Sequence, residues 1–372
     1  MNKNSVSVVV IGLVWLGLLV CSAYGIDPVR PVKGQIYIQG QQFHDDNGPI
    51  QLVGYSDYNE FSGKGEAYQA PAGYIKRISS SGLNFARVFI DFTIDSDEWL
   101  SIQTVEVNGA HAKLTPQFRT RLKEGLNAAL KHGVVVELVL FDACCYCGSG
   151  KDRDDMTKGH AHWYRHVGDG AKSNFDIINS PNLMSAQMEY VNEVLSISAA
   201  YPNVIYELAN ELGNGHSRHT PNPEAWATFV GNLIRLKTPA PISISVNRDQ
   251  FGTETELLPV IDFTGEHGSC PDEINADREP VDAKVRGIDW GRPIIWDNDG
   301  CWRDKEGRHD PARVSNWAMM ALKTGHSYNH KSPTPQYTPV LDALGEVVRT
   351  YNAEKSSSGK KKPKQAPKPV ED

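Results

Sequence analysis

Residues 203–211 read NVIYELANE, and they end on an amide and a carboxylate, Asn210 and Glu211. The Val-Ile-Tyr run at 204–206 favours a buried strand, because β-branched and aromatic residues suit a pleated surface. Packing alone gives no reason for a polar pair at the far end of such a strand. Two explanations are open: Glu211 is a solvent-exposed carboxylate that happens to follow a strand, or the strand directs it toward a substrate.

Seven further segments have the same β-forming character and are separated by amphipathic stretches. The strand-like segments are QLVGYSD (51–57), LNFARVFID (83–91), VVVELVLFD (134–142), ISISVN (242–247), VIDFTGEH (260–267), RPIIWDND (292–299) and GHSYNH (325–330). The stretches between them predict helices at 71–81, 116–132, 185–200, 224–236, 312–323 and 340–351, with a weaker one at 277–285. In the second of these, Thr115 and Pro116 mark a helix start and Gly133 a stop.

Eight strands alternating with helices predict an α/β fold, a (β/α)8 TIM barrel. An open, doubly wound sheet is the alternative, and it is disfavoured because no glycine-rich dinucleotide motif follows any strand. Before the first barrel strand, residues 34–54 contain two short β segments around the turn signal Asp46-Asn47-Gly48. We expect an N-terminal β-hairpin that closes the bottom of the barrel.

Composition and charge indicate an ordinary globular protein. The chain has 372 residues, of which 40% are hydrophobic and 22% charged, and its formal net charge is −7. Because neutralising phosphates requires a basic face, this charge argues against a nucleic-acid partner. We expect no cofactor, and we expect a monomer.

Both ends of the chain differ in composition from the segment between them. Residues 1–25 contain an early Lys, the apolar run Val6–Val20 and a small-x-small end at Ala23-Tyr24-Gly25, which is typical of a cleaved secretory signal. A retained membrane anchor is the alternative; the run is short for a membrane span. We expect a secreted protein, extracellular or periplasmic, without stable membrane association after cleavage. The expected domain is 26–352, followed by a disordered Lys/Pro-rich tail, 353–372.

A TIM barrel carries its chemistry at the carboxyl ends of its strands. The predicted strands place carboxylates, an arginine, amides, a histidine and an aromatic ring at or near these ends. These residues are Asp57, Arg87, Asp91, Asp142, Asn210, Glu211, Glu266, His267, Asp297, Asn298, Asp299 and Tyr328. Their convergence on one rim is typical of a cleft that binds and cleaves sugars.

The segment 36–352 resembles the clan-A glycoside hydrolases, the (β/α)8 retaining enzymes that include the family 5 cellulases and mannanases. The resemblance is carried by the hairpin segment, by SGLNFARVF, and by SAQMEYVNEVL followed by YPNVIYELANE, in that order along the chain. It implies that Glu211 is the acid that protonates the leaving oxygen. It also implies that Asn210 binds the sugar 2-hydroxyl and that Arg87 keeps the partner carboxylate ionised.

The segment PIIWDNDG, from Pro293 to Gly300, departs from the family pattern. Family members end this strand on the nucleophilic Glu, and here Asn298 stands at that position. An amide cannot act as an ionised nucleophile. Three possibilities follow: Asp297 or Asp299 is the second carboxylate, Glu266 replaces it, or the cleft binds sugar without cleaving it. A shorter carboxylate could leave room for water, since inverting enzymes hold their carboxyls about 6.5–9.5 Å apart against about 5–5.5 Å in retaining ones.

Aromatic side chains and a histidine add candidate substrate contacts, each of which could equally be structural. They are Trp296 and Trp302 beside the seventh strand, Trp163 in the loop after the third strand, Tyr328 where the family often has a Trp platform, and His267. The loop 144–166 contains Cys144, Cys145, Cys147, His160, His162 and His166. Its spacing fits no standard zinc site, and thiols of secreted proteins tend to form disulfides, so we expect no metal. Cys270 and Cys301 could pair with each other.

These observations predict a secreted glycoside hydrolase that cleaves O-glycosidic bonds in a polysaccharide or oligosaccharide with two carboxylates. The alternative is a non-catalytic carbohydrate-binding barrel. Neither the polysaccharide nor the stereochemical outcome follows from the sequence.

Overall fold

The protein is a closed barrel of eight parallel strands in the order β10-β11-β12-β13-β4-β5-β8-β9. The computed structural model describes residues 28–56, 60–63, 70–91, 102–142, 163–171, 174–212, 223–247, 259–267, 291–299, 310–331 and 338–358. The barrel strands are β4 (Val53–Ser56), β5 (Phe85–Phe89), β8 (Val135–Val139), β9 (Val204–Glu207), β10 (Ile242–Asn247), β11 (Phe263–His267), β12 (Ile294–Asp299) and β13 (Ser327–Lys331). The prediction of a (β/α)8 barrel is confirmed.

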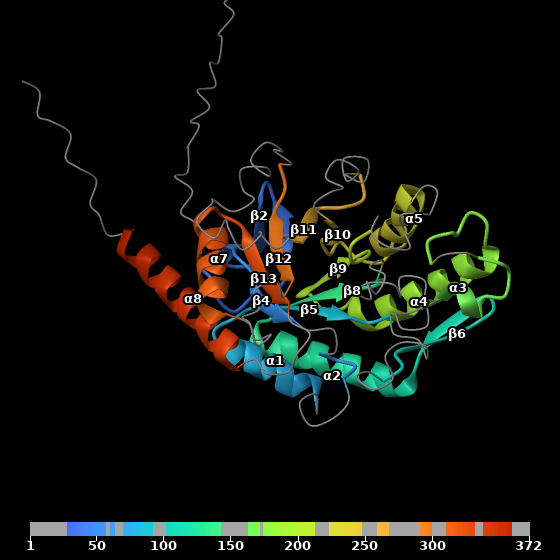
Figure 1. Cartoon of the computed structure of the whole chain (residues 1–372), viewed down its shortest axis with the longest axis horizontal. Coiled ribbons are helices and arrows are strands. Elements are labelled where there is room, and N and C mark those ends of the chain that lie inside the picture. The colour runs from blue at the N-terminus through green and yellow to red at the C-terminus, as the bar shows by residue number, and fades with distance from the viewer. Residues whose placement is uncertain are drawn as a thin grey trace, which may run out of the picture.

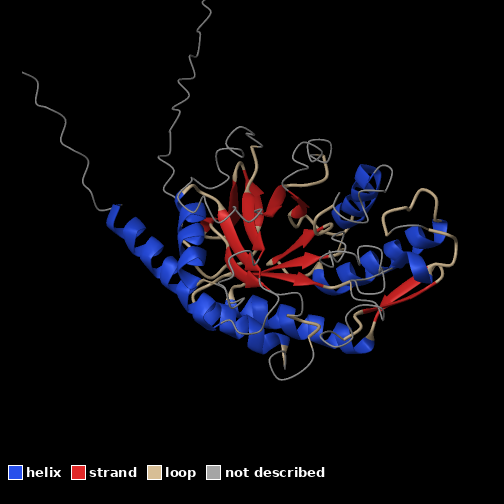
Figure 2. Cartoon of the chain, in the orientation of Figure 1, coloured by secondary structure: helices blue, strands red, loops and turns tan. Residues whose placement is uncertain are grey.

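Helices lie around the outside of the strands (Figures 1 and 2). They are α1 (Pro71–Ser80), α2 (Pro116–His132), α3 (Trp163–His166), α4 (Pro181–Ser198), α5 (Pro223–Arg235), α7 (Pro311–Lys323) and α8 (Thr338–Ser358). Residues before the proline at the helix start cap three of them: the side chains of Thr115, Ser180 and Asp310 accept hydrogen bonds from backbone N–H groups of the first turn. The expected weak helix at 277–285 lies outside the described residues.

The N-terminal segment closes the end of the barrel at which the strands begin, called the lower end below. It has one strand more than the expected hairpin: β1 (Tyr37–Gln39), β2 (Gln42–Asp45) and β3 (Gly48–Ile50) form an antiparallel three-stranded sheet. Its apolar side chains Ile36, Phe43 and Ile50 join inward-facing barrel residues in one buried cluster, with the Phe43 ring packed edge-on at 5.1 Å from that of Phe263. The barrel residues of that cluster are Leu52, Phe85, Val135, Ile205, Phe263 and Ile295.

A second hairpin, β6 (Val105–Asn108) with β7 (His111–Leu114), was not predicted. It lies beside α4, whose carboxylates Glu189 and Glu193 accept hydrogen bonds from backbone N–H groups of β7. The turn dipeptide Asn108-Gly109, flanked by alternating residues, was the signal available in the sequence.

The last helix, α8, continues to Ser358, past the expected end at Tyr351 and into the expected disordered tail. Side-chain contacts explain the extension, since Lys355 lies 5.4 Å from the ring of Tyr351 and Glu354 pairs with Lys323 at 3.2 Å. Asn352 also exchanges two hydrogen bonds with the backbone of Val29. No described helix has the length and apolar character needed to span a bilayer. The expected signal peptide and residues 359–372 lie outside the described residues.

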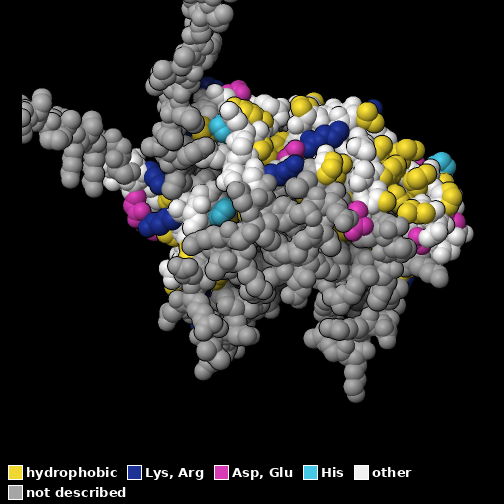
Figure 3. All heavy atoms as spheres, turned by 90° about the horizontal axis from the view of Figure 1, so that it is seen from above, with side chains coloured by type: hydrophobic (Ala, Val, Ile, Leu, Met, Phe, Trp, Pro, Cys, Tyr) yellow, Lys and Arg dark blue, Asp and Glu magenta, His cyan; other side chains and the backbone are white. Residues whose placement is uncertain are grey.

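Exposed apolar side chains gather at the end of the molecule that carries α3 and the start of α4 (Figure 3). The large ones in this region are Ile178, Met184 and Met188. Soluble monomers commonly expose modest patches of this kind. The polar side chains described below belong instead to the interior of the barrel.

Candidate active site

A single buried guanidinium, that of Arg87 in the middle of β5, organises the polar interior of the barrel. Its Nε and Nη2 donate to the two carboxylate oxygens of Glu207 at 2.5 and 2.6 Å. Nη2 also donates to Oδ1 of Asn210 at 2.7 Å, and Nη1 lies 2.7 Å from Oδ2 of Asp297. Burial alone would lower the pKa of Arg87, but the charges of Asp297 and Glu207 raise it well above its usual value, so the guanidinium stays charged.

Asn210 is held in one orientation by hydrogen bonds at both ends of its amide. Its Oδ1 accepts from Arg87, and its Nδ2 donates to Oδ1 of Asp142 at 2.8 Å. Its backbone N–H donates to Phe141 in the bridge that connects this segment to the end of β8. The amide assigned to the sugar 2-hydroxyl is therefore fully buried and fixed before any ligand arrives.

Glu211 has a left-handed backbone conformation, with φ of 52°. Among the described residues it is the only one other than glycine with a positive φ, a conformation that costs about 1–3 kcal/mol and is concentrated at functional sites. Its N–H donates to Oγ of Ser245 at 2.9 Å, and the same hydroxyl oxygen lies 3.5 Å from Nη2 of Arg87. The backbone of Glu211 is thus connected to the guanidinium through one serine.

Asp297 faces the barrel interior from β12, since the preceding inward residue of that strand, Ile295, lies in the lower apolar cluster. Besides its ion pair with Arg87, it accepts a hydrogen bond from Nδ2 of Asn329 at 2.8 Å. Only 1% of its surface is exposed. The position is therefore built to hold a carboxylate in a defined orientation.

For four of the predicted site residues the structure describes the backbone alone. In the strand register, Glu266 and His267 of β11 lie beside Trp296 and Asp297 of β12. Asn298 and Asp299 lie beside His330 and Lys331 of β13. Asp57 and Trp302 lie outside the described residues. The register brings Glu266, His267, Asn298 and Asp299 to the same end of the barrel as Glu211.

Three aromatic residues considered as sugar contacts are core residues instead. Trp296 and Tyr328, neighbours across β12 and β13, are 7% and 1% exposed and pack in the hydrophobic cluster that includes α7. They alternate with the inward-facing residues of their strands, so they point away from the barrel interior. Trp163 is fully buried, with its ring 5.0 Å from that of Tyr190. We assign all three a packing role.

Two buried glutamates near Arg87 were not among the site residues predicted from the sequence. Glu207 binds Arg87, and Glu137 of β8 accepts a hydrogen bond from the Ser243 hydroxyl at 2.7 Å while its Oε2 lies 3.9 Å from Nε of Arg87. Burial and the charge of Glu207 raise the pKa of Glu137 to about 8. The available signal was a carboxylate in the middle of an apolar strand, as in VVVELVLF and NVIYEL, because such a residue needs a buried partner.

A second pair of carboxyl groups lies behind Asn210. The backbone N–H of Asp142 donates to Oδ2 of Asp91 at 2.8 Å. Burial and the neighbouring charge of Asp142 raise the pKa of Asp91 well above its usual value. Asp142 in turn accepts the hydrogen bond from Asn210, so this pair of carboxyl groups helps to fix the amide.

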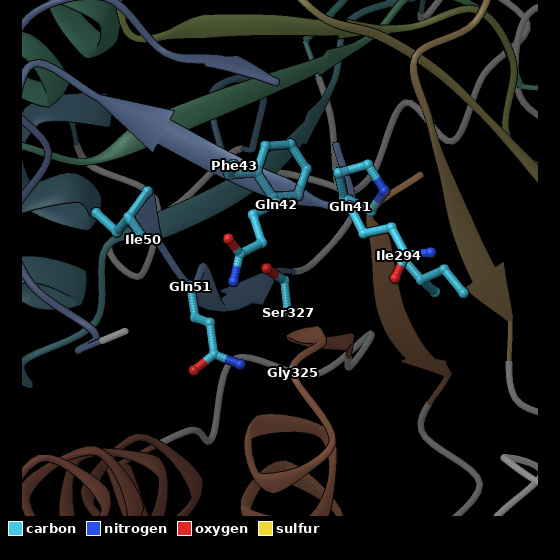
Figure 4. A pocket seen from close by; sticks show the side chains of 9 residues that line it. Gln41, Gln42, Phe43, Ile50, Gln51, Ile294, Gly325 and Ser327 are labelled. Carbon is cyan, nitrogen blue, oxygen red and sulfur yellow. The ribbon is translucent and has the colours of Figure 1, made fainter. Parts of the chain in front are cut away.

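Within the described ranges, no three His, Cys, Asp or Glu side chains are arranged to hold a metal ion. Cys144, Cys145, Cys147, His160 and His162 fall outside those ranges, as do Cys270 and Cys301, and His166 ends α3. A small pocket lies at the opposite, amino-terminal end of the barrel, where Gln41, Phe43 and Gln51 face the starts of β12 and β13 (Figure 4). That end contains none of the buried carboxylates described above.

Solved structures that are similar to this chain include glycoside hydrolases. No protein-family model and no curated protein matches the sequence. The endo-1,4-β-mannanase from Rhizomucor miehei aligns over 86% of this chain and 99% of its own, with a TM-score of 0.64 and 14% identity. The β-1,4-mannanase from the sea hare Aplysia kurodai aligns over 84% and 96%, with a TM-score of 0.56 and 14% identity.

A glycoside hydrolase family 5 mannosidase from Rhizomucor miehei aligns over 89% of this chain and 100% of its own, with a TM-score of 0.59 and 12% identity. At such low identity the likeness concerns the fold. The chain has the (β/α)8 fold of the clan-A, family 5 glycoside hydrolases.

Proposed function

We propose that the protein is a glycoside hydrolase that cleaves O-glycosidic bonds in a polysaccharide or oligosaccharide, with Glu211 as the acid and Asp297 as the second carboxylate. The observation that carries this proposal is the contact network of Arg87. One guanidinium binds Asp297 and the amide of Asn210, and through Ser245 it adjoins the backbone of Glu211. Glycoside hydrolysis requires two carboxyl groups on opposite sides of one bond.

The mechanism assigns a separate task to each carboxyl group. Glu211 transfers a proton to the glycosidic oxygen while the bond from the anomeric carbon to that oxygen breaks. Asp297, held in place by its ion pair with Arg87, either attacks the anomeric carbon or removes a proton from the water that attacks it. In the first case a water molecule then cleaves the glycosyl ester and returns a proton to Glu211; in the second, Asp297 keeps the proton.

Asp297 is favoured because its carboxylate contacts Arg87, which also binds Asn210. Asp297 and Asp299 are two positions apart on β12, so their Cα atoms are about 6–7 Å apart along the strand. Asp299 is nearer the rim and remains the alternative second carboxylate, followed by Glu266. Asn210, already fixed by Arg87 and Asp142, would bind the sugar 2-hydroxyl.

A substrate panel tests the activity. Mannan is the first choice because the structural neighbours include mannanases, followed by β-glucan, xylan and chitosan. We expect the wild type to release reducing sugar from at least one substrate, and Glu211→Gln to lose about 10²–10⁴-fold in kcat, the usual contribution of a general acid. Glu346→Gln, which changes an exposed glutamate of α8, is the matched control and keeps wild-type kcat.

Separate Asp297→Asn and Asp299→Asn variants identify the second carboxylate. The anomeric configuration of the first product distinguishes direct attack by the carboxylate from attack by water. A wild type that binds oligosaccharides but hydrolyses none of the four substrates would favour the non-catalytic barrel. That rival is motivated by Asn298 at the position where the family has its nucleophile.

We also propose that the protein is secreted, on the strength of the apolar segment 6–20 and the small residues Ala23 and Gly25. N-terminal sequencing of protein from the extracellular or periplasmic fraction of an expressing culture tests this. We expect a mature N-terminus at Ile26. A chain that retains Met1 and stays in the membrane fraction would establish the anchor alternative.

A further inference from the structure

Three buried carboxyl groups of the polar interior share one guanidinium, that of Arg87. Glu137, Glu207 and Asp297 are each at most 2% exposed. Each of the three carboxyl groups pairs with this guanidinium, at different distances. Since a poorly paired charge in a protein interior costs several kcal/mol, the carboxyl group with the weakest contact to Arg87 is expected to hold a proton.

The contacts distinguish the three groups. Glu207 accepts two short hydrogen bonds from Arg87, and Asp297 has Arg87 at 2.7 Å together with the Asn329 amide. Glu137 is 3.9 Å from the guanidinium, and the Ser243 hydroxyl is its hydrogen-bond donor. Its anion is therefore the least stabilised of the three.

We infer that Glu137 is a positioning residue that carries a proton while the site works, so that the charge of Arg87 is shared by Glu207 and Asp297 alone. This inference rests on the proposed function only where it concerns catalysis. Loss of the proton would create a third anion within 3.9 Å of Arg87. That anion would compete with Asp297 for the guanidinium and weaken the contact that fixes the second carboxylate.

The groups that face Glu137 come from four strands and agree with this assignment. Arg87 of β5 favours the anion of Glu137 and the Ser243 hydroxyl of β10 supports it, whereas Glu207 of β9 and Asp297 of β12 oppose it. Burial is the largest influence, and together with Glu207 it raises the pKa of Glu137 to about 8 from 4.5. The folded protein thus keeps a proton that the unfolded chain has lost above that lower value.

The sign of the resulting pH dependence follows from this difference. A carboxyl group with a raised pKa in the folded state contributes stability that is fully present below 4.5 and is lost as the pH rises to about 8. Glu137→Gln keeps the shape and the neutrality of the protonated side chain and has no proton to lose.

Urea unfolding of the full chain between pH 5 and 9 tests the inference without any substrate. We expect the unfolding equilibrium constant of the wild type, relative to that of Glu137→Gln, to rise by up to about tenfold per pH unit below pH 8 and then to level off. Parallel profiles of the two proteins would overturn the inference. Ser243→Ala removes the donor to the anion, and we expect it to move the levelling-off to higher pH.

The pH profile of kcat/KM tests the catalytic part. We expect an alkaline decline of the wild type near pH 8 that moves to higher pH in Glu137→Gln, and a lower kcat at pH 6 in Glu137→Ala than in Glu137→Gln. An unchanged alkaline limb would overturn the positioning role. Inactivity of the wild type on every substrate contradicts the proposed function, whereas parallel unfolding profiles contradict the proton on Glu137, so the two failures are distinguishable.

Discussion

Two layers inside the barrel are built on the same strands and have opposite chemistry. The lower layer includes Phe85, Val135, Ile205 and Ile295, and two residues further along the same four strands lie Arg87, Glu137, Glu207 and Asp297. One period of the strand, about 6–7 Å, separates an apolar plug from a charged cluster. The chain therefore obtains its packing and its candidate chemistry from successive inward positions, and each layer can be disturbed separately.

The largest expected effect comes from removing the cation of the upper layer. Arg87→Met leaves the buried carboxylates without their counter-charge, and we expect it to destabilise the protein by about 3–5 kcal/mol at pH 7. Because protonation relieves the uncompensated charge, part of the loss is recovered at pH 5. Urea unfolding at the two pH values measures this. A loss that is equal at both would mean that the upper layer depends on packing, as the lower one does.

A carboxylate at the hairpin end is expected to show the opposite pH dependence from Glu137. Asp45 accepts two hydrogen bonds from Arg30 and others from the N–H groups of Lys33 and Asn47. Burial alone would raise the pKa of Asp45, but these donors lower it below 3.8. Its contribution to stability is present above that value and is lost as the pH falls through the lowered pKa.

We therefore expect Asp45→Asn to cost about 1.5–3 kcal/mol at pH 7, the usual magnitude for hydrogen bonds to a charged group. Thermal unfolding at pH 7 and at the lowest pH where the wild type stays folded measures the difference. A cost that grows on acidification would contradict this prediction.

Gly54 lies where the two layers meet. A Cβ at this position would approach the Phe85 ring and the Phe85 carbonyl to 2.6 Å and Oδ1 of Asn329 to 2.9 Å. We expect Gly54→Ala to destabilise the protein by about 1–3 kcal/mol, because the carbonyl is backbone and cannot move aside easily. Gly265→Ala is the matched control, since the one described residue that its Cβ would meet is Ser245, at 3.2 Å. Equal unfolding midpoints for the two variants would show that the contact is not tight.

The smallest effect is expected in the lower layer. Ile295→Val removes one buried methyl group, which costs about 0.5–1.5 kcal/mol. Ile295 precedes Asp297 by one inward position, so a change of the unfolding midpoint without a change in the pH dependence of stability would show that the layers are independent. A shift in the pH dependence of stability would show that the packing of the lower layer affects the charged cluster.

The order and type of the barrel elements followed from the sequence because their signals are local. The helix 116–132 has its cap, its proline and its terminal glycine within its own segment, and the structure reproduces its bounds. All eight barrel strands also appear where the β-forming runs predicted them. The strand that was expected to end at Glu211 ends at Glu207, and Asn210, which follows it, contacts Arg87.

The charged cluster was harder to predict because it depends on which strand residues face inward together. Glu137 and Asp297 are 160 positions apart in the numbering, and only the closed barrel brings both to Arg87. The positions of Trp296 and Tyr328 were difficult to predict for the same reason. Strand register decides which side chains of β12 and β13 point outward. A shift of one residue reverses every side chain of a strand, and local composition does not specify that shift.

The pair of hydrogen bonds between Val29 and Asn352 joins the two ends of the described fold, and β13 pairs with β4 to complete the ring. The architecture is therefore defined by the cyclic order of its elements and has no obligatory starting point. During synthesis, β4 can pair with β5 early but must wait for β13 until nearly the whole domain has been made. A circular permutant that links these two ends and opens a peripheral loop would keep every neighbour relation in the ring and transfer that wait to the two strands beside the new opening.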